Sequence, residues 1–337
     1  MPKASVIAIF DVGKTNKKLL LFDEQYKLVY EESKQFEEIN DEDGFAGEDI
    51  NALTNWLKDS FLRLSDDNRF DIKALNFSGY GASFVYLDDS NKVFLPLYNY
   101  LKPYSPQLQK QFYDNYGGEN NFARLTASPV LGNLNSGMQL YRLKYEKPES
   151  FKNIRYALHL PQYLSYIFSG KPVSDITSIG CHTNLWNFED KQYHAWVAKE
   201  GVQSKLAPVE NSEEIAGYVN ENIPAGIGLH DSSAALIPYL AAVQEPFILL
   251  STGTWCISLN PFNQSPLTDD ELQHDCLCYL TYQGNAVKAS RLFAGNEHEQ
   301  QTKRLSAYFK KPNDYFTTVQ CDIALFNKLK EKDELKT

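Results

Sequence analysis

The sequence predicts an α/β protein with two domains. Its 337 residues, of which 43% are apolar and 13% aromatic, are enough to build two hydrophobic cores. Two strand–turn–strand patterns lie far apart, at residues 6–22 and 247–259, and strand-like and helix-like spacings follow one another between them. Strands that lead into helices through polar loops are typical of the α/β class.

The first strand–turn–strand pattern carries small polar residues at its turn. An apolar run at 6–10 leads towards Gly13, Lys14 and Thr15, and a second apolar run at 19–22 leads away from them. Glycine allows the backbone to approach a ligand closely, and the N–H groups of such a turn can point at an anion. Because lysine and hydroxyl side chains suit phosphate oxygens, this pattern predicts a phosphate-binding turn.

The second pattern has the same form near the end of the chain. The apolar run at 247–250 leads to Gly253 and Thr254, and residues 255–259 complete the hairpin. Two phosphate-binding turns in one chain predict a nucleotide held between two halves of the protein.

The elements after the first hairpin can be assigned in order. Residues 26–31 predict a third antiparallel strand, and we interpret the acidic segment 37–43 as a solvated surface loop. Apolar residues at helical spacing predict a helix over 49–64, and a strand is expected over 72–78.

The middle of the chain is expected to be helical and aromatic. It starts with a pair of neighbouring strands, 84–87 and 93–97, joined by a polar turn. Helices are predicted over 137–145 and 163–168, and the second should end at Gly170, because glycine is a common helix stop.

Asp231 follows a cluster of asparagine, proline and glycine at 220–228 that predicts a hinge. It is placed to begin a helix through about residue 243, with Pro238 in its first turns or at a kink. One role for Asp231 is that of a helix N-cap, which needs no chemistry. The other is that of a base for a sugar hydroxyl at the edge of a cleft between domains, and the residues alone leave both open.

Charge and apolar runs exclude several classes of partner. A net charge of −10 and a pI near 5.2 disfavour binding to nucleic acid or to anionic lipid. No apolar run approaches the roughly 20 residues of a membrane-spanning helix, and the apolar stretch after Ser5 is too short for a secretory signal. We therefore expect a cytoplasmic protein with no membrane partner; a homodimer is left open.

The cysteines indicate reduced thiols. Their number is five, and an odd count at irregular spacing forms no disulfide framework. The segment with His274, Cys276 and Cys278 resembles a metal-ligating cluster, but no second ligand pair follows at the spacing of a zinc site. We interpret the two cysteines of this segment as buried thiols on one face of a strand.

Three segments together resemble the FGGY family of carbohydrate kinases in their order and spacing. They are DVGKTNKK at 11–18, GLHDSSAA at 228–235 and STGTW at 251–255. The histidine–aspartate pair resembles the rhamnulokinase side of the family, and residues 78–83 resemble the substrate loop of xylulokinase-like members; fuculokinase belongs to the same family. The resemblance covers essentially the whole chain.

This resemblance implies a fold and a domain division. FGGY kinases have the actin-like, ribonuclease H-like duplication, with nucleotide and sugar in the cleft between two domains. The implied domains are an N-terminal sugar-binding domain over 1–224 and a C-terminal nucleotide-binding domain over 225–337. The chain has no counterpart of the glycine-rich adenine segment of the family, so we expect an incomplete second domain.

The resemblance also implies roles for single residues. Asp231 matches the catalytic base, and Asp11 matches the carboxylate that holds Mg²⁺, through water. The residues that match the ATP phosphate turns are Gly13, Lys14, Thr15, Gly253 and Thr254. The residues that match sugar contacts are Tyr80, Gly81, Asn99 and Tyr100. His230 either contacts the substrate or packs beside the base.

The implied activity is ATP- and Mg²⁺-dependent phosphorylation of a small sugar, a ketose or deoxyketose, at a primary hydroxyl. Lys14 stands where many relatives have a threonine or another small residue. Tyr100 and Lys102 stand where xylulokinase-like members have an aspartate and an arginine, so the identity of the sugar is left open. Two other classes also stay open: a sugar- or nucleotide-binding relative without useful transfer, and an actin- or chaperone-like ATPase.

Overall fold

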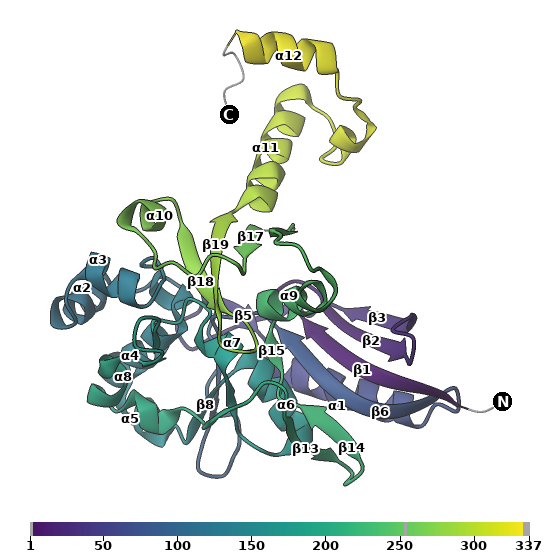
Figure 1. Ribbon diagram of the computed structural model, residues 1–337, viewed down its shortest axis with the longest axis vertical. Helices are drawn as coiled ribbons and strands as arrows, with labels where there is room; N and C mark the ends of the chain where they lie inside the picture. The colour runs from purple at the N-terminus through teal and green to yellow at the C-terminus, as the bar shows by residue number, and fades with distance from the viewer. Residues whose placement is uncertain (1–2, 253–254, 333–337) are drawn as a thin grey trace. The chain divides into compact units, whose positions relative to one another are not determined.

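The computed structural model describes residues 3–252 and 255–332 (Figure 1). The chain forms two compact units. The larger contains Met1–Leu249 and Ser258–Ser290, and the smaller contains Leu250–Ile257 and Arg291–Thr337. The first turn and the predicted sugar-contacting residues all belong to the larger unit.

A seven-stranded mixed sheet forms the centre of the larger unit. β1 (Ala4–Val12) pairs antiparallel with β2 (Lys17–Asp23), which pairs antiparallel with β3 (Leu28–Lys34), so the predicted hairpin and third strand are confirmed. β6 (Phe70–Gly79) runs parallel to β1 on its other side. The remaining strands of this sheet are β13 (Ile215–Val219), β14 (Ile223–Gly226) and β15 (Leu229–His230).

Two predicted helices pack on this sheet and complete its core. Asp49 caps α1 (Ile50–Ser65), because its side chain accepts hydrogen bonds from the first free backbone N–H groups of the helix. Gly170, with a φ of 67°, ends α6 (Leu160–Ser169) in the left-handed conformation that favours glycine. The ring of Phe10 on β1 stacks against Phe168 of α6 at 5.7 Å.

A second, aromatic core fills the middle third of the chain. Its centre is Phe112 on α2 (Pro106–Asn115), whose ring centroid lies 4.9–5.1 Å from those of Phe122, Tyr141 and Trp196. The other helices of this region are α3 (Glu119–Leu125), α4 (Ser136–Glu146), α5 (Pro148–Asn153), α7 (Ile176–Ile179) and α8 (Ala195–Lys199).

The prediction of a strand at 93–97 was wrong. β7 (Phe84–Leu87) instead pairs antiparallel with β8 (Tyr156–His159), and the expected partner segment forms only single bridges, one of them between Leu87 and Val93. Pro96 has no backbone N–H to donate to a ladder, whereas β8 offers a nearly fully buried apolar partner.

The acidic segment is largely exposed to solvent, as the sequence indicated, but part of it is a strand and not a loop. It contains β4 (Glu38–Asn40), which pairs with β5 (Ala46–Glu48), and the turn between them is neutralised by lysine. The Lys102 Nζ lies 2.5 Å from a carboxylate oxygen of Asp41 and 2.5 Å from one of Asp43. Because the cation comes from a distant part of the chain, local composition could not reveal it.

The predicted hinge at 220–228 is part of the central sheet. β13 and β14 form a hairpin, and Asn220 and Glu221 in its turn have φ values of 49° and 65°. The domain boundary at residue 224 stays a prediction.

The last third of the chain contains α9 (Asp231–Ala242), with Pro238 inside it, and a second sheet. The strands of this four-stranded sheet are, in spatial order, β16 (Leu249–Ser251), β17 (Cys256–Asn260), β19 (Ala286–Leu292) and β18 (Cys276–Leu280). β16 and β17 are neighbours, so the strands of the second predicted hairpin are confirmed. The remaining helices are α10 (Asp269–Gln273), α11 (Ala294–Phe309) and α12 (Ile323–Glu331).

Short elements connect these larger ones. Besides β15, the two-residue strands of the described chain are β9 (Ser174–Asp175), β10 (Trp186–Asn187), β11 (Gln192–Tyr193) and β12 (Val209–Glu210). The 3-10 helices are η1 (Gly132–Leu134), η2 (Val202–Lys205) and η3 (Tyr315–Thr318).

Candidate active site

Three parallel strands end together beside the predicted catalytic residues. β6 runs parallel to both β1 and β15, and its residue Ser78 is the register partner of Asp11 and of Leu229. His230 and Asp231 follow Leu229 directly, so β15 delivers them to the sheet edge at which Asp11 lies. Ligands of open α/β sheets bind at this carboxyl edge of the strands.

Asp231 is the first residue of α9, and His230 is the N-cap, so the N-cap role considered for Asp231 was wrong by one residue. Its Oδ1 accepts hydrogen bonds from the backbone N–H of Ser232 at 2.6 Å and from the hydroxyl of the same residue at 3.3 Å. Burial raises the pKa of Asp231 to about 6, and the two hydrogen bonds act in the opposite direction. The carboxyl is therefore partly desolvated. Since 37% of the side chain is exposed, it is still accessible from solvent.

Asp11 and Asp231 influence each other electrostatically. Burial raises the pKa of Asp11, a hydrogen bond with Ser78 lowers it, and the negative charge of Asp231 raises it again. A cation near Asp11 would relieve this repulsion, and Mg²⁺ commonly uses one or two carboxylates together with water and phosphate oxygens. Asp11 therefore fits the role of a magnesium-holding carboxylate. Within residues 3–252 and 255–332, no cluster of three or more His, Cys, Asp or Glu side chains is arranged to hold a metal ion.

His230 packs beside the carboxyl of Asp231. Its side chain is 4% exposed, and its Nε2 lies 3.2 Å from Oδ1 of Asp231 and 3.0 Å from Sγ of Cys181. Burial lowers the pKa of His230 to about 3, so the ring is neutral at pH 7. The contact with Cys181 has hydrogen-bond geometry, and its direction depends on the tautomer of the ring. Of the two roles expected for His230, this geometry favours packing beside the base.

Gly81 leaves the space that the His230 ring occupies. A Cβ atom at position 81 would lie 3.0 Å from Cδ2 of His230 and 3.0 Å from Sγ of Cys181, closer than nearly all real Cβ contacts. The predicted sugar-contacting glycine therefore decides where the imidazole can sit.

The first predicted phosphate turn closes tightly at its glycine. The backbone N–H of Gly13 donates to the carbonyl of Asn16 at 3.0 Å, and a Cβ on Gly13 would lie 3.1 Å from that oxygen. The second predicted turn cannot be described in the same way, because Gly253 and Thr254 lie outside the described residues.

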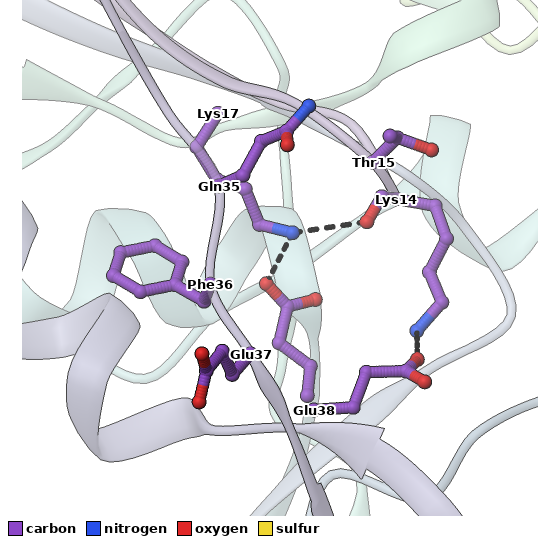
Figure 2. Close-up of a pocket in the computed structure, with 8 residues that line it drawn as sticks. Lys14, Thr15, Lys17, Gln35, Phe36, Glu37 and Glu38 are labelled. Atoms are coloured by element: carbon purple, nitrogen blue, oxygen red, sulfur yellow. Dashed lines mark hydrogen bonds and ion pairs between the residues drawn. The ribbon is translucent and has the colours of Figure 1, made fainter.

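The side chains of the first turn line a pocket of about 240 Å³ (Figure 2). Lys14 and Thr15 lie on one side of it, and the Lys14 Nζ is 3.5 Å from a carboxylate oxygen of Glu38. The same Nζ lies 5.9 Å from the centre of the Tyr80 ring. Lys14 thus stands between the turn and the predicted sugar side.

Tyr80 and Tyr100, both predicted to contact sugar, lie edge to face, with ring centroids 6.2 Å apart. The Tyr80 hydroxyl donates to Oε2 of Glu48 at 2.6 Å. Burial, followed by the charge of Glu48, raises the pKa of Tyr80 well above its ordinary value. Burial, followed by the charge of Asp231, raises the pKa of Tyr100. Both hydroxyls are therefore donors at neutral pH, and Tyr100 lies within the electrostatic reach of the proposed base.

Asn99 uses its side chain to shape the backbone. Its Nδ2 donates to the carbonyl of Ala46 at 2.9 Å, and its Oδ1 accepts from the N–H of Leu101 at 3.0 Å. The residue is 8% exposed. Both polar ends of the amide are thus engaged within the protein, and this structure favours a structural role for a residue predicted to contact sugar.

Comparison with known proteins identifies the family. Residues 6–237 match the N-terminal domain of the FGGY family of carbohydrate kinases, and residues 244–323 match the Carbohydrate kinase FGGY C-terminal domain. The chain belongs to the FGGY family of carbohydrate kinases. The resemblance inferred from the three motifs is confirmed.

Two curated relatives of this FGGY chain are rhamnulokinases. It is 23% identical to that of Oceanobacillus iheyensis over 210 residues, which cover 58% of this chain and 43% of the relative. It is 22% identical to that of Halalkalibacterium halodurans over 262 residues, which cover 73% of this chain and 54% of the relative. The chain thus spans about half the length of the curated relatives it matches.

A solved structure establishes the fold. The crystal structure of a carbohydrate kinase from Novosphingobium aromaticivorans is similar, with a TM-score of 0.78 and 24% identity, over 90% of this chain and 66% of that one. The predicted α/β, actin-like fold is confirmed. No helix in the described part of the chain has both the length and the apolar character needed to cross a membrane.

Sequence reasoning missed two residues of this FGGY site, Lys17 and Glu48. Their side chains are 4% and 3% exposed and lie 2.6 Å apart as an ion pair. A signal for Lys17 was present, because it shares a strand face with Leu19 and Leu21, which are buried. Glu48 gave no comparable signal, since its partners lie elsewhere in the sequence.

Proposed function

We propose that this FGGY chain transfers the γ-phosphoryl group of ATP to a hydroxyl of a small sugar, a ketose or deoxyketose. The main support is the carboxyl of Asp231, which is desolvated, accessible and close to Asp11 at the carboxyl edge of the sheet. A base acts best when its pKa lies near the working pH, and a pKa of about 6 meets that condition. Rhamnulose, a deoxyketose, is a candidate substrate because relatives are named rhamnulokinase.

In the proposed reaction, ionised Asp231 accepts the proton of the attacking sugar hydroxyl. The sugar oxygen forms a bond to the γ-phosphorus while the bond between this phosphorus and the bridging oxygen breaks, and ADP leaves with the electron pair. The neutral ring of His230 would pack against the carboxylate and limit its movement without carrying a charge. Tyr100 would offer a hydroxyl donor to the sugar, and Tyr80, whose hydroxyl donates to Glu48, would contribute an aromatic ring beside it.

The remaining residues would position the nucleotide. Phosphoryl transfer depends mainly on positioning and on neutralising phosphate charge. Asp11 would hold Mg²⁺, which supplies much of that neutralisation when bound. The residues proposed to bind the phosphates are Gly13, Lys14, Thr15, Gly253 and Thr254. Since ATP and reduced thiols are found in the cytoplasm, we propose that the protein acts there.

A coupled ADP-release assay tests this proposal. The chain would be supplied with MgATP and a panel of ketoses, deoxyketoses, aldoses and polyols, beside Asp231→Asn and the matched exposed control Asp59→Asn. Sugar-dependent ADP release that is lost only in Asp231→Asn would support the kinase. ADP release without sugar would indicate an actin- or chaperone-like ATPase. Ligand-induced stabilisation without turnover would indicate a binding protein, and either result would overturn the proposal.

A further inference from the structure

A buried ion pair lies beneath the first turn. The Lys17 Nζ lies 2.6 Å from Oε1 of Glu48, and both side chains are almost fully buried. A buried charge without its partner strongly destabilises a protein, whereas two well-packed apolar residues can replace such a pair with little loss. The pair therefore need not be retained for stability alone.

Lys17 also holds the backbone of the turn. Its Nζ donates to the carbonyl oxygen of Lys14 at 3.0 Å, and Figure 2 shows the side chain reaching back to that carbonyl. Lys14 lies between Gly13 and Thr15, which are proposed to bind phosphate. The ammonium group of Lys17 thus fixes one peptide group in the middle of the turn.

Glu48 connects this arrangement to the sugar side. While its Oε1 faces Lys17, its Oε2 accepts the hydroxyl of Tyr80 at 2.6 Å. The backbone N–H of Tyr80 donates to the carbonyl of Val12, at the start of the turn, at 3.1 Å. A continuous polar chain therefore runs from the turn carbonyl through the ion pair to the tyrosine.

The β4–β5 hairpin, which carries Glu48, contacts both the first turn and the segment next to Tyr100. Glu38 on β4 lies 3.5 Å from the Nζ of Lys14. Ala46 on β5 accepts the side chain of Asn99, next to Tyr100, at 2.9 Å. The β4–β5 hairpin is therefore fixed to the phosphate turn and to the segment of the sugar-side tyrosines.

We propose that Glu48 is a positioning residue that holds the phosphate turn and Tyr80 in one rigid unit. Loss of the tyrosine hydroxyl, on the sugar side, would then loosen the turn that faces the nucleotide. The consequence for catalysis rests on the proposed kinase function, whereas the rigid unit itself can be tested without any ligand. The competing explanation is that the ion pair only stabilises the fold.

Hydrogen exchange followed by mass spectrometry decides between these explanations. Tyr80→Phe removes the hydrogen bond to Glu48 and keeps both charges. The control Tyr163→Phe removes another buried tyrosine hydroxyl from the same core, one that lies 2.9 Å from the hydroxyl of Thr54. We expect exchange in a peptide over 11–18 to rise about three- to tenfold in Tyr80→Phe and not in the control. Equal exchange in the two variants would overturn the proposal.

The ion pair provides an independent test. Lys17→Met leaves Glu48 buried without its partner, and we expect it to lower the melting temperature, whereas the double variant Lys17→Met/Glu48→Met should recover most of that loss. If Glu48 positions the turn, the double variant keeps fast exchange over 11–18 and binds MgADP about three- to tenfold more weakly than the original chain. If slow exchange returns together with stability, the pair is structural and the proposal is wrong.

The two proposals can fail separately. Exchange over 11–18 is measured on the ligand-free chain, so it reports on the rigid unit even if no sugar is phosphorylated. Absence of ADP release with every sugar would overturn the kinase function and leave the exchange result intact. Active enzyme with unchanged exchange in Tyr80→Phe would overturn the role of Glu48 alone.

Discussion

The Nε2 of His230 lies 3.2 Å from Oδ1 of Asp231, and the imidazole is buried while the carboxyl is partly open. Burial keeps the ring neutral by lowering its pKa to about 3. A neutral ring can limit the movement of the carboxylate by contact, whereas a cationic partner would lower the carboxyl pKa and weaken it as a base. The pair thus combines a fixed orientation with a pKa of about 6 for Asp231.

The rate of the proposed reaction should depend on the ionisation of Asp231. Below a pH of about 6 the carboxyl carries a proton and cannot accept another, so we expect kcat/KM for the sugar to fall about tenfold per pH unit there. Above that pH, kcat/KM should reach a plateau. Measuring kcat/KM for the sugar at saturating MgATP checks this expectation, in steps of about half a pH unit from about pH 4.5 to about pH 8.5.

Asp231→Asn gives the matching test at a single pH. The amide keeps the shape of the side chain and cannot take up the proton, so we expect kcat to fall by about 10²–10⁴ at pH 7.5. Asp59→Asn, on the exposed face of α1, should keep full activity. A variant at Asp231 with an unchanged rate would show that another group, or none, acts as the base.

The same substitution should make the protein more stable at neutral pH. The folded-state pKa of Asp231 is about 6, above its ordinary value of 3.8, so folding favours the protonated carboxyl. Stability therefore falls as the pH rises from about 4 to 6, and the loss persists above that range. Because 37% of the side chain is open to solvent, we expect Asp231→Asn to add only about 1 kcal/mol to the unfolding free energy at pH 7.5.

Urea unfolding at two pH values checks this prediction. At a pH of about 3 or below, most of the aspartate is protonated in both states, and the two proteins should differ little in stability. A variant that is less stable than the original chain at pH 7.5 would show that the carboxylate contributes favourable contacts that outweigh its desolvation.

The sequence predicted best those elements whose signals are local. The helix after Asp49 has both an N-cap and a regular apolar spacing, and the hairpin of β1 and β2 has a turn glycine between two apolar runs. Asp231 could be placed at the start of a helix for the same reason. In each case the residues that decide the structure lie within a few positions of one another.

The failures concern contacts between distant segments. The strand expected at 93–97 is replaced by β8 as the partner of β7, and although Pro96 weakens the expected strand, no local pattern points to the distant β8. The acidic turn is neutralised by Lys102, and Glu48 finds Lys17 and Tyr80 only after folding. A charged side chain looks solvated in the sequence unless its position on a strand face indicates burial, as it does for Lys17.

Ser232 should tune the base through its hydroxyl. Ser232→Ala removes the hydrogen bond at 3.3 Å that lowers the pKa of Asp231 and keeps the backbone hydrogen bond at 2.6 Å. We expect the acidic limb of the kcat/KM profile to move upward by about half a pH unit. The neighbouring Ser233→Ala is the control, because that hydroxyl donates to the carbonyl of Leu280 instead. If the acidic limb of the kcat/KM profile lies at the same pH in Ser232→Ala and Ser233→Ala, the Ser232 hydroxyl does not act on the base.

Gly81 should control the position of His230 through space alone. A Cβ there would lie 3.0 Å from the imidazole and from the sulfur of Cys181, so Gly81→Ala must displace one of them. If the imidazole moves, its 3.2 Å contact with the Asp231 carboxyl is disturbed, and we expect kcat to fall about tenfold or more. The melting temperature should fall as well, because the contact is buried.

A second substitution separates these two effects. Cys181→Ala removes the sulfur that lies 3.0 Å from both the new Cβ and Nε2 of His230, and so gives the ring room to remain near its original place. We expect Gly81→Ala/Cys181→Ala to recover part of the lost kcat relative to Gly81→Ala. Recovery of the melting temperature without recovery of kcat would show that the imidazole position is not what limits the rate.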